Sequence, residues 1–213
     1  MMAVNVHLEV PGGHGEVLLH ACCAPCSSAI VECMMQQGVR PVLYYSNSNI
    51  HPFEEFEHRR SECERYAQKW GVGMIVDEYD HDAWLAAVRG LENERERGPR
   101  CLQCFRQRLL RAAVFARANG YAVLTTTLAS SRWKRLDQVN EAGEWACREA
   151  NAMAMDGPQV AWWDQNWRKG GLQERRNEII REMDFYNQLY CGCEFSVRNS
   201  SSISNNSPKL SMM

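Results

Sequence analysis

The sequence has no long apolar run and no targeting segment, and both absences limit what the chain can be. Its 213 residues contain no stretch near the ~20 apolar residues that a membrane-spanning helix needs. Residues 1–10 lack the basic start and the apolar core of a signal peptide. We therefore expect a cytoplasmic protein without a membrane segment.

Net charge is also scarce. The formal value of −2 gives no overall field that would draw the chain to DNA or to a membrane surface. Charge is uneven, however, because residues 95–117 hold seven arginines and one acid, Glu96. That segment predicts a local basic surface of the kind that binds phosphates. A dinucleotide fingerprint is missing, since Gly12, Gly13 and Gly15 do not follow a strand and open a helix.

Five short apolar segments alternate with helical patterns along the chain. We expect strands at residues 17–21, 41–45, 73–77, 121–126 and 159–163. This alternation predicts an α/β fold, namely a Rossmann-like (HUP-like) parallel sheet of about five strands flanked by helices. We expect one domain over residues 1–198 and a disordered Ser/Asn-rich tail over residues 199–213.

The first strand runs into residues 22–28, which read Cys-Cys-Ala-Pro-Cys-Ser-Ser. Ser27 or Ser28 is predicted to cap the next helix. Three cysteines would then lie at the carboxyl end of a strand, where open α/β sheets bind ligands, and beside a helix N-terminus, which lowers thiol pKa. The last helix is expected over residues 172–190, with Cys191-Gly192-Cys193 at its end.

Cysteine is abundant, at ten residues. Disulfides are rare in the expected compartment, so the thiols need another role. Cys33, Cys63 and Cys147 fall in helical patterns and are predicted to be core thiols. The other seven form three clusters, which are Cys22, Cys23 and Cys26; Cys101 and Cys104; and Cys191 and Cys193. Three clusters in one small domain predict metal or redox chemistry.

The cysteine spacing leaves several kinds of site open. A four-cysteine zinc site wants two paired knuckles, and the adjacent Cys22 and Cys23 form a poor one. An iron–sulfur cluster accepts irregular spacing, and the first two clusters supply four thiolates for a 4Fe-4S cube. A thioredoxin-like dithiol at Cys101-x-x-Cys104 is a rival, although it leaves Cys22 and Cys23 unexplained.

Polar and aromatic residues follow several predicted strands. His20 lies within an apolar strand and is predicted to be a core histidine. Trp133 and Trp167 are open to two interpretations, as platforms for an unstacked base or as core residues. Candidate substrate contacts follow the second, fourth and fifth strands, where basic groups suit a phosphate backbone. These candidates are Asn49, His51, Lys134, Arg168 and Lys169.

Taken together, the motifs resemble those of the cobalamin-independent epoxyqueuosine reductases, the QueH family. The shared motifs are Leu-His-Ala-Cys-Cys-Ala-Pro-Cys at 19–26, Asn-Ile-His-Pro at 49–52, Arg-Cys-Leu-Gln-Cys-Phe at 100–105, Thr-Thr-Thr-Leu at 125–128, Trp-Arg-Lys-Gly at 167–170 and Tyr-Cys-Gly-Cys at 190–193. They span residues 17–196 in the family's order. The chain departs from the family at 131–134, where Ser-Arg-Trp-Lys stands in place of Ser-Pro-Tyr-Lys.

This resemblance implies an oxidoreductase that reduces epoxyqueuosine to queuosine at the tRNA wobble position, using an unidentified electron donor. It implies a 4Fe-4S cluster and a second, mononuclear iron. Carried over by motif, the cluster ligands are Cys22, Cys23, Cys101 and Cys104. Cys191 and Cys193, with Cys26 as third ligand, would hold the second iron and act in catalysis.

Reduction of an epoxide needs electrons and an electrophile at the epoxide oxygen, which are the two functions that the implied cluster and second iron would supply. Two alternatives remain from different classes. One is an ATP-using tRNA-modifying enzyme of the adenylating and thiolating type, which needs a phosphate-binding Ser-Gly-Gly-type loop where residues 21–26 read Ala-Cys-Cys-Ala-Pro-Cys. The other is a zinc-stabilised RNA-binding module.

Overall fold

The computed structural model describes residues 4–13, 15–153, 156–188 and 190–196. Five parallel strands form one sheet in the order β3-β2-β1-β4-β5, which confirms the predicted α/β fold. The strands are β1 (Glu16–His20), β2 (Arg40–Tyr45), β3 (Met74–Val76), β4 (Val123–Thr126) and β5 (Ala161–Trp162). The predicted tail over residues 199–213 lies outside the described residues.

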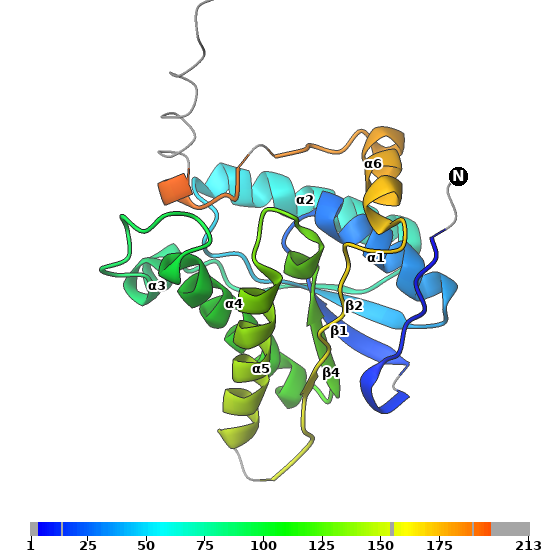
Figure 1. The fold of residues 1–213 in the computed structure, drawn as a ribbon, viewed down its shortest axis with the longest axis horizontal. Helices are drawn as coiled ribbons and strands as arrows, with labels where there is room; N and C mark the ends of the chain where they lie inside the picture. Colours follow the sequence, from blue (N-terminus) through cyan, green and yellow to red (C-terminus); the bar gives the residue numbers. More distant parts are fainter. Residues whose placement is uncertain (1–3, 14, 154–155, 189, 197–213) are drawn as a thin grey trace, which may run out of the picture.

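Helices cover both faces of the sheet (Figure 1). The helices are α1 (Ala24–Gln36), α2 (Phe53–Trp70), α3 (His81–Ala87), α4 (Pro99–Ala118), α5 (Leu136–Ala152) and α6 (Leu172–Met183), with 3₁₀ turns η1 (Pro11–Gly13) and η2 (Thr127–Ser130). One face carries α1, α2 and α6, and the other carries α4 and α5. None of the helices within the described ranges is long and apolar enough to cross a membrane.

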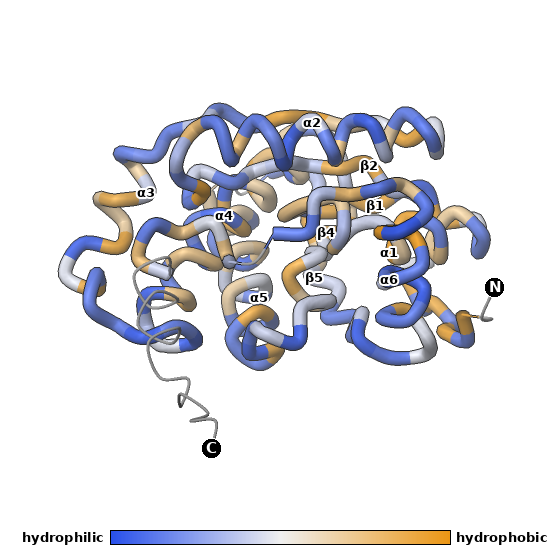
Figure 2. Tube along the Cα trace, turned by 90° about the horizontal axis from the view of Figure 1, so that it is seen from above, coloured by the Kyte–Doolittle hydropathy of each residue, from blue (hydrophilic) through white to orange (hydrophobic). Residues whose placement is uncertain are grey.

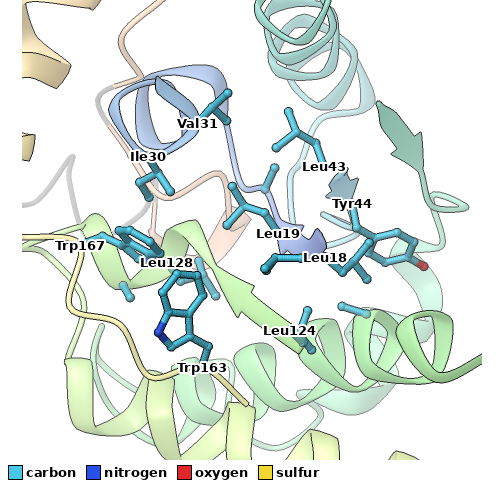
Figure 3. Packing of buried hydrophobic residues seen from close by; sticks show 14 of the residues in the cluster. Leu18, Leu19, Ile30, Val31, Leu43, Tyr44, Leu124, Leu128, Trp163 and Trp167 are labelled. Carbon is cyan, nitrogen blue, oxygen red and sulfur yellow. The ribbon is translucent and has the colours of Figure 1, made fainter. Parts of the chain in front are cut away.

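Alternating side chains of the central strands fill both halves of the core. Leu19 points toward Ile30 and Val31 of α1, whereas Leu18 points toward the face that α4 covers (Figure 3). On that second face the ring of Tyr44 stacks on Phe115 of α4, with ring centroids 4.7 Å apart. Figure 2 shows hydrophobic residues gathered along the inner strands and hydrophilic ones along much of α2. Burial of this apolar surface is the main force that holds the layers together.

Three connections leave the sheet at the same edge. The chain turns away after β1, β2 and β4, the three neighbouring central strands, and β1 sends its helix to one face while β4 sends its helix to the other. The backbone N–H of Cys22, after β1, donates to Thr127 Oγ1, after β4, over 3.0 Å. Parallel α/β sheets bind ligands at such a switch point.

The start of α1 differs from expectation. Helix α1 begins at Ala24 with Cys23 at its N-cap, and no side chain caps it. The predicted capping by Ser27 or Ser28 is wrong, because both hydroxyls lie inside the helix and donate back to carbonyls of the preceding turn. Cys26 therefore belongs to the first helical turn.

The last helix is shorter than expected. Helix α6 ends at Met183, and Asp184 adopts a left-handed conformation with φ of 50°. The prediction of a helix over residues 172–190 is wrong beyond Met183. From there the chain runs across the top of α1 and α2 to the Cys191–Cys193 hook (Figure 1). We call residues 184–190, whose position 189 lies outside the described set, the strap.

Only part of the expected basic surface over residues 95–117 is present. Arg100 and Arg108 are buried, and the guanidiniums of Arg106 and Arg111 are ion-paired with carboxylates. These four arginines stabilise loops and helix contacts, whereas Arg95 and Arg97 of the same segment are exposed.

Candidate metal centre

A cavity of about 680 Å³ lies at the carboxyl edge of the sheet. Five of the seven clustered cysteines line it, and they come from three distant segments of the sequence. These five are Cys22, Cys26, Cys101, Cys191 and Cys193. Cys23 and Cys104 are almost fully buried beside them. The fold thus gathers the thiols that the sequence marked as clustered.

The first group of thiols is compact. The sulfurs of Cys22, Cys23 and Cys26 all lie within 4.8 Å of one another, and the three residues could hold a metal ion. Hydrogen bonds with Cys23 and Cys26 lower the pKa of Cys22 well below its ordinary value. Burial raises the pKa of Cys23, and the hydrogen bond shared with Cys22 raises that of Cys26 to about 11. Cys22 is therefore the thiol of this group that loses its proton most readily.

The turn between β1 and the start of α1 positions these three sulfurs. Cys22 lies two residues after the end of β1, Cys23 is the N-cap of α1 and Cys26 lies in the first turn of that helix. The hydroxyl of Thr127, at the start of η2, donates to Cys22 Sγ over 3.2 Å. The partial positive charge at the α1 N-terminus adds to the stabilisation of a thiolate at this position.

The second and third groups meet each other. Cys101 lies in the first turn of α4, and its sulfur accepts from the backbone N–H of Arg97 over 3.2 Å. Cys104 and Cys193 pack in one small buried cluster with Trp84. Burial raises the pKa of Cys101 to about 11 and that of Cys193 to about 12. A cation among these thiols would offset that burial cost, as thiolate ligands require.

The cysteines that lie close together in the structure are not the sets that the resemblance assigns to the two metal sites. The structure places Cys26 with Cys22 and Cys23, and it places Cys193 with Cys104. The implied division instead takes Cys26 and Cys193 together for a second iron. All of the thiols lie in or beside one cavity, so that division stays a prediction.

The Cys191-Gly192-Cys193 hook is held from behind by a buried arginine. Arg59 of α2 donates from Nη1 to the carbonyl oxygen of Cys191 over 3.1 Å and from Nη2 to that of Tyr190 over 3.3 Å. Its Nε pairs with Glu55 at 2.6 Å. These contacts fix the backbone direction from which both hook thiols emerge.

Gly192 is required at the centre of the hook. Its φ of 98° is a conformation that glycine adopts readily. A Cβ atom there would come within 2.9 Å of Ile50 Cγ1 and 3.0 Å of Arg59 Nη1. The carbonyl oxygen of Gly192 accepts a hydrogen bond from the backbone N–H of His51 over 2.9 Å. The hook therefore closes against the turn after β2.

Two of the five predicted substrate contacts line the cavity, Asn49 and Lys134. The Oδ1 atom of Asn49 is buried and has no hydrogen-bond partner within the described part of the chain. Burial opposes the charge of Lys134, but the nearby thiols of Cys191 and Cys22 outweigh it and raise the pKa of the amine.

The other three predicted contacts do not line it. His51 is exposed and stacks on His81, with ring centroids 5.0 Å apart. Arg168 donates from Nη2 to the carbonyl oxygen of Lys134 over 2.8 Å, so it positions the loop that carries that lysine. Lys169 is exposed next to it. Direct contact of these three with substrate stays a prediction.

His20 is a core residue, as predicted. Its ring is fully buried between Thr126 Oγ1 at 2.7 Å and the carbonyl oxygen of Ser46 at 3.1 Å. Burial, reinforced by the charge of Arg108, lowers its pKa to about 3. The histidine is therefore neutral and ties three strand ends together.

The two tryptophans differ. Trp167 is fully buried against Trp163, so the core interpretation holds for it. Trp133 is 68% exposed and lines the cavity mouth. The guanidinium of Arg132 lies 5.6 Å from the centroid of the Trp133 ring. The carbonyl oxygen of Trp133 accepts a hydrogen bond from Arg97 Nε over 2.8 Å. An exposed aromatic ring beside cationic groups suits a nucleotide base.

Sequence reasoning missed three residues of the site. Thr127 stood within a quoted motif but had no assigned role. Arg59 lies on a helix rich in charged residues, where an arginine is ordinarily solvated. Gln188 donates from Nε2 to Cys23 Sγ over 2.8 Å, and no local pattern marks it. Only the tertiary contacts of the strap could reveal it.

The chain is similar to several known proteins. The family described as "Epoxyqueuosine reductase QueH" matches residues 17–199. Three proteins named Epoxyqueuosine reductase QueH are similar to the chain. The protein from Histophilus somni is 42% identical over 92% of this chain and 78% of its own length. The Haemophilus influenzae protein is 41% identical over the same shares, and the Acinetobacter baylyi protein is 39% identical over 93% of this chain and 88% of its own. The chain belongs to the QueH family of epoxyqueuosine reductases.

Proposed function

We propose that this chain reduces epoxyqueuosine to queuosine in tRNA, with electrons that pass through iron held by its clustered cysteines. The observation that carries the proposal is the convergence of cysteines from three distant segments on one cavity. Family membership supplies the reaction, and the cavity supplies a place for it. A tRNA substrate places the reaction in the cytoplasm.

The donor set fits iron–sulfur chemistry. Thiolates are soft ligands that suit both zinc and iron–sulfur clusters. Zinc carries no redox chemistry, so a reductase favours iron. We assign Cys22, Cys23, Cys101 and Cys104 to a 4Fe-4S cluster. A second, mononuclear iron is assigned to Cys191 and Cys193, with Cys26 as its third ligand.

Removing the epoxide oxygen breaks two C–O bonds, forms a C=C bond and releases water. The balance requires two electrons and two protons, and an electron donor of unidentified class must bring the electrons. When bound, the iron supplies electrons singly and an electrophile for the epoxide oxygen.

The chain's own residues arrange the substrate for this step. Lys134 lines the cavity. Burial lowers the pKa of its amine, but the neighbouring thiols raise it by more, so the amine is a cation at neutral pH. It would stabilise negative charge that develops on the departing oxygen. The unpartnered Oδ1 of Asn49 would accept a hydrogen bond from the bound nucleotide.

The cavity mouth supports binding of a single-stranded RNA loop. Arg97, Arg132, Arg135 and Arg176 line it together with Trp133. Proteins read RNA bases in loops by stacking splayed bases on aromatic rings while cations contact the phosphates. The wobble nucleotide lies in such a loop, so its reacting group could enter the cavity.

The proposed function is tested by one assay. Chain purified without oxygen is mixed with dithionite and with tRNA that contains epoxyqueuosine, and the nucleosides are then weighed by mass spectrometry. We expect conversion to a nucleoside that is lighter by one oxygen atom. Unchanged epoxyqueuosine, with iron shown to be present, would reject the proposal.

Replacing Trp133 should weaken tRNA binding. Stacking of one base on an aromatic ring contributes about 1–3 kcal/mol, so Trp133→Ala should raise the Kd for tRNA roughly 5- to 150-fold. The measurement is a binding titration at low salt. Met153→Ala is the matched control, since Met153 is 63% exposed but does not line the cavity, and its Kd should not change. Equal Kd values for both variants would move the base platform elsewhere.

A further inference from the structure

One side-chain amide joins the strap to the first cysteine group. The strap, to which Gln188 belongs, runs between α6 and the hook (Figure 1). Its Nε2 donates to Cys23 Sγ over 2.8 Å, and Cys23 is only 1% exposed. The strap thus supplies a hydrogen bond to a buried sulfur that is far from it in sequence.

The other end of this amide is unused. Gln188 Oε1 is buried and has no hydrogen-bond partner within the described ranges, and the residue lines the cavity. A buried acceptor without a partner is destabilising, so it calls for a ligand that donates to it. The same amide therefore donates to a sulfur that the proposed function makes an iron ligand, while its oxygen is left without a partner in a residue that lines the cavity.

The strap is anchored firmly enough to fix this geometry. Phe185 is 5% exposed, and its ring meets Tyr66 of α2 edge-on with centroids 5.5 Å apart. The guanidinium carbon of Arg65 lies over the Phe185 ring, 5.0 Å from its centroid. Arg59 holds the far end of the strap through the carbonyl oxygen of Tyr190. With both ends held on α2, Gln188 is presented to Cys23.

We propose that Gln188 is a positioning residue that couples substrate binding to the metal centre. Its N–H···S bond stabilises the more negative, reduced state of the centre and so raises the reduction potential. Its oxygen accepts from a hydroxyl or amine of the modified nucleoside. That contact polarises the amide and strengthens the N–H···S bond, because linked hydrogen bonds are cooperative. The proposal rests on the proposed function, since it takes Cys23 as an iron ligand.

Two variants separate the ends of the amide. Gln188→Leu removes both the donor and the acceptor, whereas Gln188→Glu removes the donor and keeps an acceptor. Gln173→Leu is the matched control for the potential, because Gln173 lines the same cavity but donates to the carbonyl oxygen of Ser130. Iron content and the absorption spectrum are recorded first, so that only loaded protein is compared.

The readout is the midpoint potential from an anaerobic redox titration, with and without tRNA that contains epoxyqueuosine. We expect both Gln188 variants to shift to more negative potentials than wild type and Gln173→Leu. Added tRNA should raise the wild-type potential but leave that of Gln188→Leu unchanged. Gln188→Leu should also lose about tenfold in preference for modified over unmodified tRNA, as expected for one hydrogen bond.

A wild-type potential in both iron-loaded Gln188 variants would overturn the proposal. If Gln188→Leu does not retain iron, Gln188→Glu alone decides, and a wild-type potential in that variant overturns it equally. Failure of the proposed function is distinguishable, because wild-type protein would then hold no iron or leave epoxyqueuosine intact before any variant is compared.

Discussion

Cys101→Ser should turn a brown protein nearly colourless and abolish epoxyqueuosine reduction. A neutral hydroxyl then replaces a soft thiolate at one corner of the proposed cluster. The fold should survive, because Cys101 is only partly buried, and the serine oxygen can accept the same backbone N–H of Arg97. The measurement is the visible absorption spectrum of protein purified without oxygen, with iron determined on the same sample.

The matched control for this variant is Cys147→Ser. Cys147 is 4% exposed in the core and does not line the cavity. Its replacement should keep the colour and the iron, at some cost in stability. A brown, fully loaded Cys101→Ser protein would show that Cys101 is not a ligand.

Removing both hook thiols should separate the two proposed iron sites. We expect the variant with Cys191→Ala and Cys193→Ala to keep the cluster absorption, to lose about one iron atom per chain and to lose epoxide reduction, as removal of a separate electrophilic site requires. Iron analysis, the spectrum and the mass-spectrometric assay together give the result.

This experiment also tests how the cysteines are divided. Cys193 packs beside Cys104, and Cys26 packs beside Cys22 and Cys23. If the double variant loses the whole cluster absorption, the hook thiols are cluster ligands and the division is wrong. Full activity would exclude a catalytic role for the hook.

Much of the fold followed from the sequence because the strands are short apolar runs with clear breaks. Parallel strands that share one sheet must place their carboxyl ends together, so cysteines after β1 were expected at the ligand-binding edge. Tertiary contacts bring the other two cysteine groups, Cys101 with Cys104 and Cys191 with Cys193, to the same edge. Helix α4 starts there because a long loop precedes it, and the hook reaches it through the strap.

The wrong end of α6 has a specific cause. Apolar residues continue at helical spacing beyond Met183, yet Asp184 turns the chain out of the helix. The helical spacing was continued by Tyr186 and Tyr190, but their hydroxyls donate to Glu55 Oε2 and to the carbonyl oxygen of His51, so these rings reflect packing of the strap and not a helical face. Periodicity cannot distinguish these two uses of an apolar side chain.

The burial of two arginines could not be predicted from the sequence either. Arg59 and Arg108 sit in charged helices that predict solvated faces, but both are nearly fully buried. Arg108 donates to the carbonyl oxygen of Ser46 and to Asn47 Oδ1, and Arg59 donates to the hook. Burial of a guanidinium requires such partners, and only the folded chain brings them together.

Every step proposed for this chain depends on redox-active iron in the cysteine-lined cavity. The decisive measurement is the amount of iron, acid-labile sulfide and zinc per chain, together with the absorption spectrum, in protein purified without oxygen. We predict brown protein with about four sulfides and about five irons per chain, as a 4Fe-4S cluster and one further iron require. Colourless protein with stoichiometric zinc and no sulfide would contradict the account.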